Sequence, residues 1–481
     1  MKRKGWAALG LLALVGVGVC AAAAALQHAG VAPRQLGPYL ERRTSGHNPL
    51  IEKSGRWLAA TLVALDRGDD GLAPDLPLRL GAQPGPLPQA AGEGGGRPVP
   101  VAGIEALRAA LAQAEPGDVI TLLPGRYRIT APLDARRAGS AQAPITVRAR
   151  SPGSVLLEQE SVEGFRVSAP YWRFENLAMH GVCSDDAGCE HAFHVSGGGH
   201  HFVARNNTLV DFNAHFKING ADRVFPDHGL VESNTLTNTR ARRTANPVTP
   251  IDLVAASDWT FRRNLISDFV KAEGDGVSYG GFAKGGGARN LFEQNLVWCE
   301  RRLRGLPGQR IGLSLGGGGT DKPYCRDQAC VVEQEEGSLR NNLIVGCSDV
   351  GIYLNSAARS SVVHNTLVDT IGIDARFPTT SAEVEGNLVD GSIRSRNGGV
   401  LRPRDNLDTA PLYAYLGYHP LRALYAAPLA LDFAWRGDAP RRKGDEVGHL
   451  GPDLCGRART APPAYGAFDS FTPCLGGRAV N

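Results

Sequence analysis

Residues 203–210 read VARNNTLV, residues 260–267 read TFRRNLIS, and residues 291–298 read LFEQNLVW. Each stretch is a short strand-like run, an Asn, and a second apolar run. The pattern recurs at eight asparagines: Asn176, Asn207, Asn234, Asn264, Asn295, Asn342, Asn365 and Asn387. Their separations are 31, 27, 30, 31, 47, 23 and 22 residues. Internal repeats of this length are typical of solenoid proteins.

Another strand-like run, such as FHVSG or IDLVA, lies about ten to thirteen residues before the repeated Asn. Three short strands per repeat predict one coil of a right-handed parallel β-helix. We expect the Asn to adopt a left-handed conformation at a tight turn, with its amide bonded to the amide of the next coil. A leucine-rich repeat would instead require an LxxLxL frame and a steadier period. We therefore predict an all-β, single-stranded right-handed parallel β-helix of three short sheets and about ten coils, between about residues 117 and 398.

The flanks of the repeat differ from it in composition. Lys2 to Lys4 precede an apolar run from Trp6 to Leu26, a pattern typical of an export signal that is either cleaved or retained as a membrane anchor. A helix is expected to start at Asn48-Pro49, and a helix over 103–114 should cap the first coil. The expected segments are 1–26 as signal peptide or anchor, 27–102 as helical segment and Gly/Pro-rich linker, 103–400 as β-helix, and 401–481 as an irregular C-terminal extension.

Composition limits the classes of function. The 481 residues include 52 Lys plus Arg and 48 Asp plus Glu, so the net charge is +4. This weak charge argues against a nucleic-acid partner, and a hydrophobic content of 42% argues against a disordered chain.

Cysteine usage indicates an oxidising compartment. With Cys20 set aside, eight cysteines remain, and an even number in an exported chain is typical of disulfides. Zinc would be the alternative, but no CxxC spacing with His partners supports it. Loop proximity, coil phase and elimination predict the pairs Cys183–Cys189, Cys325–Cys330, Cys299–Cys347 and Cys455–Cys474.

Several segments resemble a known group of proteins. Residues 116–129 read PGDVITLLPGRYRI, residues 143–157 read APITVRARSPGSVLL, and the chain ends with GPDLCGRAR and PAYGAFD. Together with the Asn repeat they resemble the pectate-lyase-like superfamily, and the opening is most similar to polysaccharide lyases of the chondroitinase-B and alginate-lyase type. The resemblance implies a Lys and an Arg as base and acid, and a calcium ion that neutralises a uronate carboxylate.

The motifs that carry those residues in the family are not visible here, so the site is argued from coil positions. Alignment on the Asn places polar residues of one strand in each coil in a column on an outer face: His194, Lys217, Asp252, Lys284, Ser314 and Asn355. Three long charged loops, at 238–250, 268–281 and 299–310, should stack beside this face. Local Arg enrichment there is typical of a site for an anionic polymer, although solvated loops also carry Arg.

These positions suggest roles. We assign Lys284 and Lys217 as candidate bases, and Arg304 joins them in the catalytic group as a ligand for the substrate carboxylate. Substrate binding is assigned to Arg240, Arg242, Arg310, His194 and Asn355. A possible Ca²⁺ would be held by Asp252, Glu273 and Asp275, because calcium prefers carboxylate oxygens.

The predicted function is β-elimination on an anionic, uronic-acid polysaccharide by an exported, periplasmic or extracellular protein. We expect a monomer whose membrane contact is limited to a possible N-terminal anchor. Two alternatives stay open: a glycoside hydrolase on the same scaffold, which would need paired carboxylates, and a non-catalytic β-helix that binds polysaccharide or has a structural role in the cell envelope.

Overall fold

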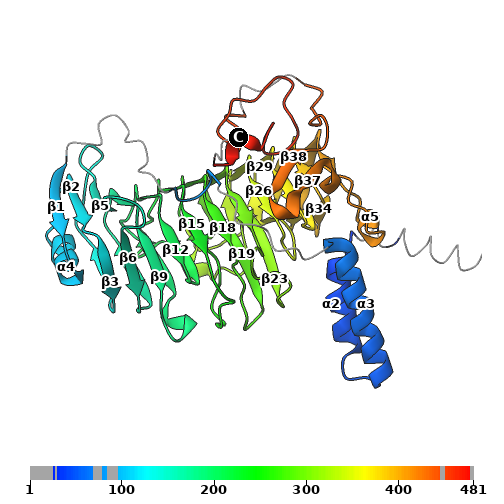
Figure 1. Ribbon diagram of the computed structural model, residues 1–481, viewed down its shortest axis with the longest axis horizontal. Coiled ribbons are helices and arrows are strands. Elements are labelled where there is room, and N and C mark those ends of the chain that lie inside the picture. Colours follow the sequence, from blue (N-terminus) through cyan, green and yellow to red (C-terminus); the bar gives the residue numbers. More distant parts are fainter. Residues whose placement is uncertain are drawn as a thin grey trace, which may run out of the picture.

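The computed structural model describes residues 30–68, 78–83, 96–444 and 450–476, together with Ala25 and Gln27. The body is a right-handed parallel β-helix, which confirms the predicted fold class (Figure 1). The predicted signal peptide or anchor lies almost entirely outside the described residues. Within them, no helix is both long and apolar enough to cross a membrane.

Three long parallel sheets form the walls of the coils. Among the described residues, the first sheet has twelve strands, from β1 (Arg97–Val101) to β35 (Val400–Arg404). The second has ten strands, from β4 (Leu133–Ala135) to β34 (Ser392–Arg396). The third has eleven, from β3 (Gly125–Ile129) to β36 (Leu407–Asp408). The coils therefore begin earlier and end later than the predicted 117–398.

A ladder of buried Asn side chains joins the coils between the first and third sheets. The Nδ2 of each ladder Asn donates to the Oδ1 of the next at 2.9–3.1 Å, and the backbone N–H donates to the same oxygen. The ladder comprises Asn207, Asn234, Asn264, Asn295, Asn342, Asn365, Asn387 and Asn406. The predicted stacking is confirmed, because the coils from Asn207 to Asn406 repeat the same turn.

Two details of the predicted ladder were wrong. The left-handed residue is the one before the ladder Asn: Ser233, Arg263 and Gln294 have φ of 56°, 56° and 55°. Asn176 itself has φ of 61°, so it occupies this preceding position. Leu177 stands at the first rung, and its N–H donates to Oδ1 of Asn207. The strand carrying Asn176 is thus one residue out of phase with the sequence pattern.

Aromatic side chains fill the inside of the early coils. Phe165, Phe193 and Phe216 occupy one register position on β7 (Glu163–Val167), β10 (His191–Ser196) and β13 (Ala214–Asn219). Their rings are stacked, with centroids 5.4 and 5.3 Å apart. Helix α4 (Ile104–Ala112) covers the open end with buried Leu107 and Leu111, as predicted.

The N-terminal part forms a helical hairpin that projects from the opposite end of the body (Figure 1). Helix α3 (Pro49–Arg67) starts as predicted, since Oδ1 of Asn48 accepts from the N–H of Leu50. The sequence of residues 27–47 predicts irregular structure before α3, yet Pro33–Thr44 form helix α2. The internal Gly37 and Pro38 disfavour a helix, and packing against α3 overrides that preference.

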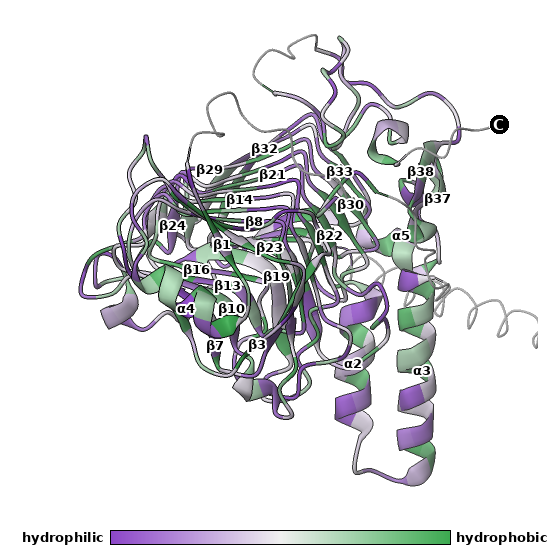
Figure 2. Ribbon diagram, turned by 60° about the vertical axis from the view of Figure 1, so that its left-hand side comes forward, coloured by the Kyte–Doolittle hydropathy of each residue, from purple (hydrophilic) through white to green (hydrophobic). Residues whose placement is uncertain are grey.

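The C-terminal extension covers the outer face of the third sheet rather than hanging free (Figure 2). It includes α5 (Pro411–Tyr415), β37 (Tyr425–Ala427) and β38 (Asp432–Trp435). Trp298, Val345 and Val368 point outward from the sheet and are buried in a second core with Phe433 and Phe468. Without the C-terminal extension, these outward-facing apolar side chains would be exposed to water.

All four predicted disulfides are present: Cys183–Cys189, Cys299–Cys347, Cys325–Cys330 and Cys455–Cys474. Cys299–Cys347 joins neighbouring coils, as the repeat phase predicted.

Candidate functional site

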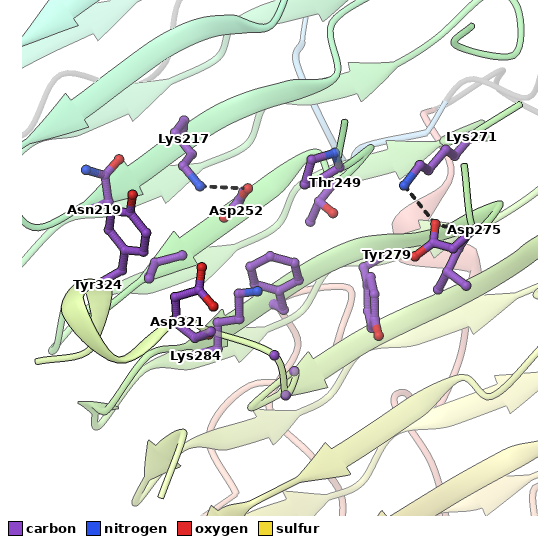
Figure 3. A pocket seen from close by; sticks show the side chains of 18 of the residues that line it. Lys217, Asn219, Thr249, Asp252, Lys271, Asp275, Tyr279, Lys284, Asp321 and Tyr324 are labelled. Carbon is purple, nitrogen blue, oxygen red and sulfur yellow. Dashed lines mark hydrogen bonds and ion pairs between the residues drawn. The ribbon is translucent and has the colours of Figure 1, made fainter. Parts of the chain in front are cut away.

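A pocket of about 630 Å³ lies on the outer face of the second sheet (Figure 3). Its floor is formed by β13, β16 (Ile251–Val254) and β19 (Val277–Lys284). Residues 317–324 form one wall, next to the Cys325–Cys330 disulfide. Its polar lining comes from Lys217, Asn219, Thr249, Asp252, Lys271, Asp275, Tyr279, Lys284, Thr320, Asp321 and Tyr324.

Strand register brings Lys217, Asp252 and Lys284 into this pocket, but not as a single column. Lys217 is directly paired with Asp252, and the next position is Phe282. Lys284 is paired with Val254 and lies two residues further along the strand. Because side chains alternate, both rows point outward. The predicted column is therefore corrected to two neighbouring rows on one face.

Lys217 and Asp252 form an ion pair on the pocket floor. The Lys217 Nζ lies 3.0 Å from Asp252 Oδ2. Asp252 is 4% exposed, and its second oxygen, Oδ1, has no hydrogen-bond partner among the described residues. A buried acceptor without a partner is costly in a native protein. Asp252 thus holds Lys217 in place and retains one free acceptor.

Lys284 has a different environment. The structure describes no ion pair for it, and its Nζ lies 4.6 Å from the centroid of the Phe282 ring. Burial lowers the pKa of Lys284; the Asp252 carboxylate opposes this effect, and the Lys217 ammonium adds to it. A Cβ on Gly317 would lie 3.0 Å from Cδ of Lys284, so a glycine there lets the wall approach closely. The result is a partly buried amine that loses its proton more readily than an ordinary Lys.

The far side of the pocket holds a second pair and a phenol. Lys271 Nζ lies 2.7 Å from Asp275 Oδ1. Burial raises the pKa of Tyr279, so its hydroxyl keeps its proton. Sequence reasoning missed Tyr279, Asp321 and Tyr324 as lining residues. The run GGGGTDKPYC before a predicted disulfide was the available signal for a close-lying wall.

The Arg residues assigned to the site do not line the pocket, which corrects the prediction for the whole group. Arg242 is 1% exposed and lies 3.0 Å from Asp186, and Arg240 lies 2.6 Å from the same carboxylate. These residues satisfy charges within the loops. Their local enrichment reflects loop structure rather than a cationic wall.

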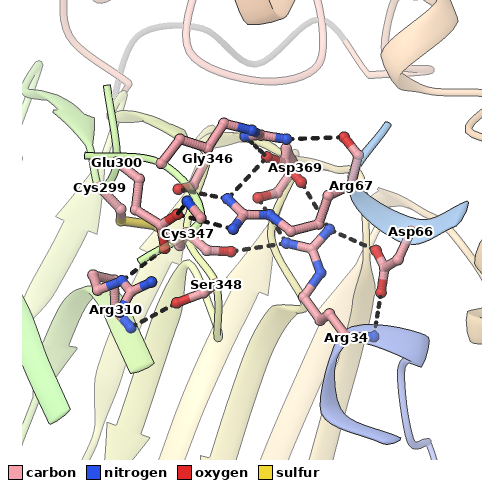
Figure 4. Close-up of polar contacts among 12 residues, drawn as sticks. Arg34, Asp66, Arg67, Cys299, Glu300, Arg310, Gly346, Cys347, Ser348 and Asp369 are labelled. Atoms are coloured by element: carbon pink, nitrogen blue, oxygen red, sulfur yellow. Dashed lines mark hydrogen bonds and ion pairs between the residues drawn. A yellow bond between two sulfur atoms is a disulfide. The ribbon is translucent and has the colours of Figure 1, made fainter. Parts of the chain in front are cut away.

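Arg304 and Arg310 belong to a buried network that attaches the helical hairpin. Figure 4 shows Arg310 and the residues around it. We call this network the clamp; it consists of Arg34, Asp66, Arg67, Glu300, Arg304, Arg310 and Asp369. Arg310 Nε lies 2.7 Å from Glu300 Oε1, and Arg304 Nη1 lies 2.6 Å from Asp369 Oδ2. Neither guanidinium lines the pocket, so the catalytic and binding roles predicted for them are not supported.

His194 and Asn355 lie beside the pocket rather than in it. His194 Nε2 lies 2.8 Å from Oδ1 of Asn219, which lines the pocket, and Nδ1 lies 2.5 Å from Glu163. Asn355 donates from Nδ2 to the hydroxyl of Tyr353. His194 is thus placed to orient Asn219, whereas Asn355 supports the wall at Gly318.

The residues predicted to hold calcium do not form a cation site. Asp252 is occupied by Lys217, Asp275 by Lys271, and Glu273 does not line the pocket. Within the described part of the chain, no group of three or more His, Cys, Asp or Glu could hold a metal ion. Calcium requires several oxygen ligands, so the residues present do not fit it.

Comparison with solved structures agrees with the fold. The chain is similar to a pectate lyase, with a TM-score of 0.53, 15% identity and coverage of 79% of this chain and 98% of that chain. It also matches a rhamnogalacturonan lyase (TM-score 0.45, 11% identity, 64% and 87% coverage) and the catalytic unit of an α-1,3-glucanase from Streptomyces thermodiastaticus (TM-score 0.40, 16% identity, 69% and 65% coverage). No family model and no curated protein sequence matches the chain. The protein thus has a pectate-lyase-like β-helix fold.

Proposed function

We propose that the protein is a polysaccharide lyase that cleaves a uronic-acid polymer by β-elimination in this pocket. The observation that carries the proposal is Lys284, an amine with a lowered pKa and no ion pair among the described residues, on the floor of a substrate-sized pocket. The likeness in fold to a pectate lyase is consistent with it.

Lys284 is the proposed base. In its neutral form it takes the C5 proton of the uronate and becomes an ammonium. The electron pair of that C–H bond forms the C4–C5 double bond as the C4–O bond breaks. The leaving oxygen must gain a proton, which the hydroxyl of Tyr279 or the ammonium of Lys217 can supply. The lowered pKa of Lys284 makes the neutral base more accessible than that of an ordinary Lys.

Positive charge is needed beside the substrate carboxylate as negative charge develops on it. Lys217 supplies this charge, because its pair with Asp252 holds the ammonium on the floor next to Lys284. Asp252 Oδ1 offers an acceptor for a sugar hydroxyl. The calcium ion implied by the sequence resemblance does not fit, so no step depends on it.

The four disulfides support an oxidising, extracytoplasmic compartment, where such polymers occur. Export and the monomeric state stay predictions.

The test is an assay of the full-length protein against alginate, chondroitin sulfate, dermatan sulfate, heparin and pectin. A lyase produces an unsaturated uronate, followed by its ultraviolet absorbance. We expect product from one polymer, in the presence of a chelator as well as calcium, and none from Lys284→Ala.

The other outcomes distinguish the alternatives. New reducing ends without the double bond would indicate a hydrolase. Saturable binding with no product from any polymer would indicate a binding protein. Full activity in Lys284→Ala would overturn the assignment of the base.

A further inference from the structure

The helical hairpin packs in an unusual way, with small residues inside. A Cβ on Gly37 of α2 would lie 2.9 Å from the carbonyl oxygen of Ala59 on α3. A Cβ on Gly55 of α3 would lie 1.9 Å from Oγ1 of Thr44. The two helices therefore approach closely at both glycines, where a larger side chain would clash.

The large apolar residues of α3 point away from α2 instead. Leu50 is 76% exposed and Trp57 is 69% exposed, whereas a water-soluble amphipathic helix buries such side chains. At helical spacing, residues 50, 51, 57, 58 and 65 share one side of the helix. This side consists of Leu50, Ile51, Trp57, Leu58 and Leu65, and all five are exposed.

The exposed surface continues onto the segment after α5. A Cβ on Gly417 would lie 3.2 Å from Leu65, so the two elements touch at this point. Leu416 is 69% exposed and Tyr418 is 55% exposed. We call this surface the α3–α5 surface: Leu50, Ile51, Trp57, Leu58, Leu65, Leu416 and Tyr418. Exposed apolar patches of this extent mark interaction sites.

The described residues just after the N-terminal apolar run contact the body beside this surface. Gln27, directly after the run, accepts a hydrogen bond from the N–H of Leu412 through its Oε1 at 3.2 Å. The carbonyl of Val31 accepts from the hydroxyl of Tyr415 at 3.0 Å. Both contacts are to α5. A membrane that holds the run Trp6–Leu26 would therefore meet the protein at α5.

The charge of the hairpin favours an anionic partner. Four basic residues are exposed on α2 and α3, against one exposed acidic residue, Glu41, and the partly buried Glu52. The basic residues are Arg42, Arg43, Lys53 and Arg56. Trp and Tyr beside Lys and Arg are typical of the water–bilayer interface. Anionic lipid headgroups match this combination.

The clamp fixes the orientation of the hairpin. Arg34 of α2 lies 2.8 Å from Asp369, and Arg67 of α3 lies 2.9 Å from Glu300 (Figure 4). These are buried ion pairs between the base of the hairpin and turns of the β-helix. The α3–α5 surface is thus presented by the body in one fixed direction.

We propose that the α3–α5 surface lies in the headgroup region of an anionic lipid bilayer, so that the β-helix is held at a membrane surface by more than its N-terminal run. The hairpin lies on the bilayer and does not span it, because neither of its helices is long and apolar enough to cross a membrane. This inference is independent of the activity proposed for the pocket.

The test uses the emission of Trp57 in the full chain on vesicles of phosphatidylcholine and phosphatidylglycerol. Part of the phosphatidylcholine carries bromine on its acyl chains, which quenches only Trp inside the bilayer. Subtraction of the Trp57→Phe spectrum isolates Trp57, because Trp6 and the other four Trp contribute equally to both proteins. We expect the Trp57 emission to shift to shorter wavelength and to fall about twofold with brominated lipid.

A matched pair of triple variants separates the surface from general effects. Leu50→Ser, Leu58→Ser and Leu416→Ser together should remove the quenching of Trp57. Val162→Ser, Val224→Ser and Val331→Ser together alter equally exposed residues elsewhere and should leave it intact. Phosphatidylcholine alone should reduce the quenching, because the anionic charge is lost.

Two results would overturn the proposal. The first is Trp57 emission that bromine leaves unchanged while the protein is bound to the vesicles. The second is a lipid-free dimer, seen by sedimentation, that shields Trp57 and is abolished by the Leu50, Leu58 and Leu416 variant. That second result would assign the surface to another copy of the chain.

Discussion

At the residue scale, the pocket assigns different roles to two lysines on one sheet. Lys217 has a carboxylate 3.0 Å away and is held as a cation. Lys284, two strands away on β19 and two residues further along, has a ring face instead and a lowered pKa. Environment, not residue type, thus separates a charge-stabilising group from a base.

Lys284→Met is expected to reduce turnover by about a hundredfold or more, because the base is removed. It should not reduce the melting temperature. The lowered pKa means that the folded protein holds the Lys284 proton less tightly than the unfolded chain does. Lys284 therefore lowers stability below its unfolded pKa, and stability recovers as pH rises through the interval between the folded and unfolded values. Calorimetry measures the melting temperature of both proteins. A clearly lower value for Lys284→Met would contradict the prediction that Lys284 does not stabilise the fold.

The pH dependence of kcat/KM provides a separate check. The neutral amine is the active form, so the rate should rise with pH and level off above the lowered pKa of Lys284. Asp252→Asn removes the opposing carboxylate, so the rise should move to lower pH. An unchanged midpoint in that variant would show that another group controls the rate.

At the element scale, the Asn ladder determines how coils are joined. Asn295 accepts from the backbone and side chain of Asn264 and donates to Asn342 and to the carbonyl of Phe261. All of these groups are buried, so none of them can form a replacement hydrogen bond with water. Each rung thus satisfies backbone groups in two neighbouring coils.

Asn295→Ala should lower the free energy of unfolding by about 3 kcal/mol, because buried donors lose their acceptor. Asn176→Gly is the matched control: Asn176 lies outside the ladder at a left-handed turn, which glycine adopts readily. Chemical denaturation of both variants makes the comparison. Equal losses would mean that the ladder contributes no more than any turn residue.

The clamp is the second feature that joins elements, because it attaches the helical hairpin to the β-helix. Asp369 is buried among Arg34, Arg67, Arg304 and Arg422, so Asp369→Asn should cost about 3–5 kcal/mol in docking of α2 and α3. Hydrogen exchange of the two helices measures this loss. Glu52→Gln breaks the exposed pair with Arg56 and should cost under about 0.5 kcal/mol. Similar exchange in both variants would refute a role for the clamp.

Acid should also weaken the clamp through the neighbouring Asp390, whose Oδ2 accepts from the backbone N–H of Asp369. Burial opposes ionisation of Asp390, but Arg422 and His419 lower its pKa to about 2 from 3.8. A lowered carboxyl pKa stabilises the folded state above the unfolded value and ceases to do so as the pH falls through the folded value. Helix docking should therefore persist at pH 4 and weaken towards about pH 2.

At the scale of the whole molecule, the C-terminal extension completes the β-helix. Its aromatic residues cover Trp298, Val345 and Val368, which point outward from the third sheet. A chain that ends after Asp408 should bind a hydrophobic dye and aggregate, since this face would be exposed. A soluble, dye-free truncation product would show that the extension is dispensable.

The sequence by itself determined the β-helix, its N-terminal cap, the start of α3 and all four disulfides. These features depend on local signals or on the phase of the repeat: an Asn at the repeated turn, a cap at Asn48, and cysteines at nearly equal steps after Asn295 and Asn342. Coil phase also placed Lys217, Asp252 and Lys284 on one outer face, because strand alternation is the same in every coil.

Only the tertiary structure decided which charges are free to act. Arg242 and Arg304 look like solvated loop residues in the sequence, yet each lies against a carboxylate from a distant segment. The same holds for α2, which forms because α3 packs against it, and for the outward Trp298, which the C-terminal extension covers. Pairing and burial depend on contacts between residues far apart in the chain, and no local pattern records them. Such contacts, and not the residue type, place the lysines in the pocket and the arginines in buried ion pairs.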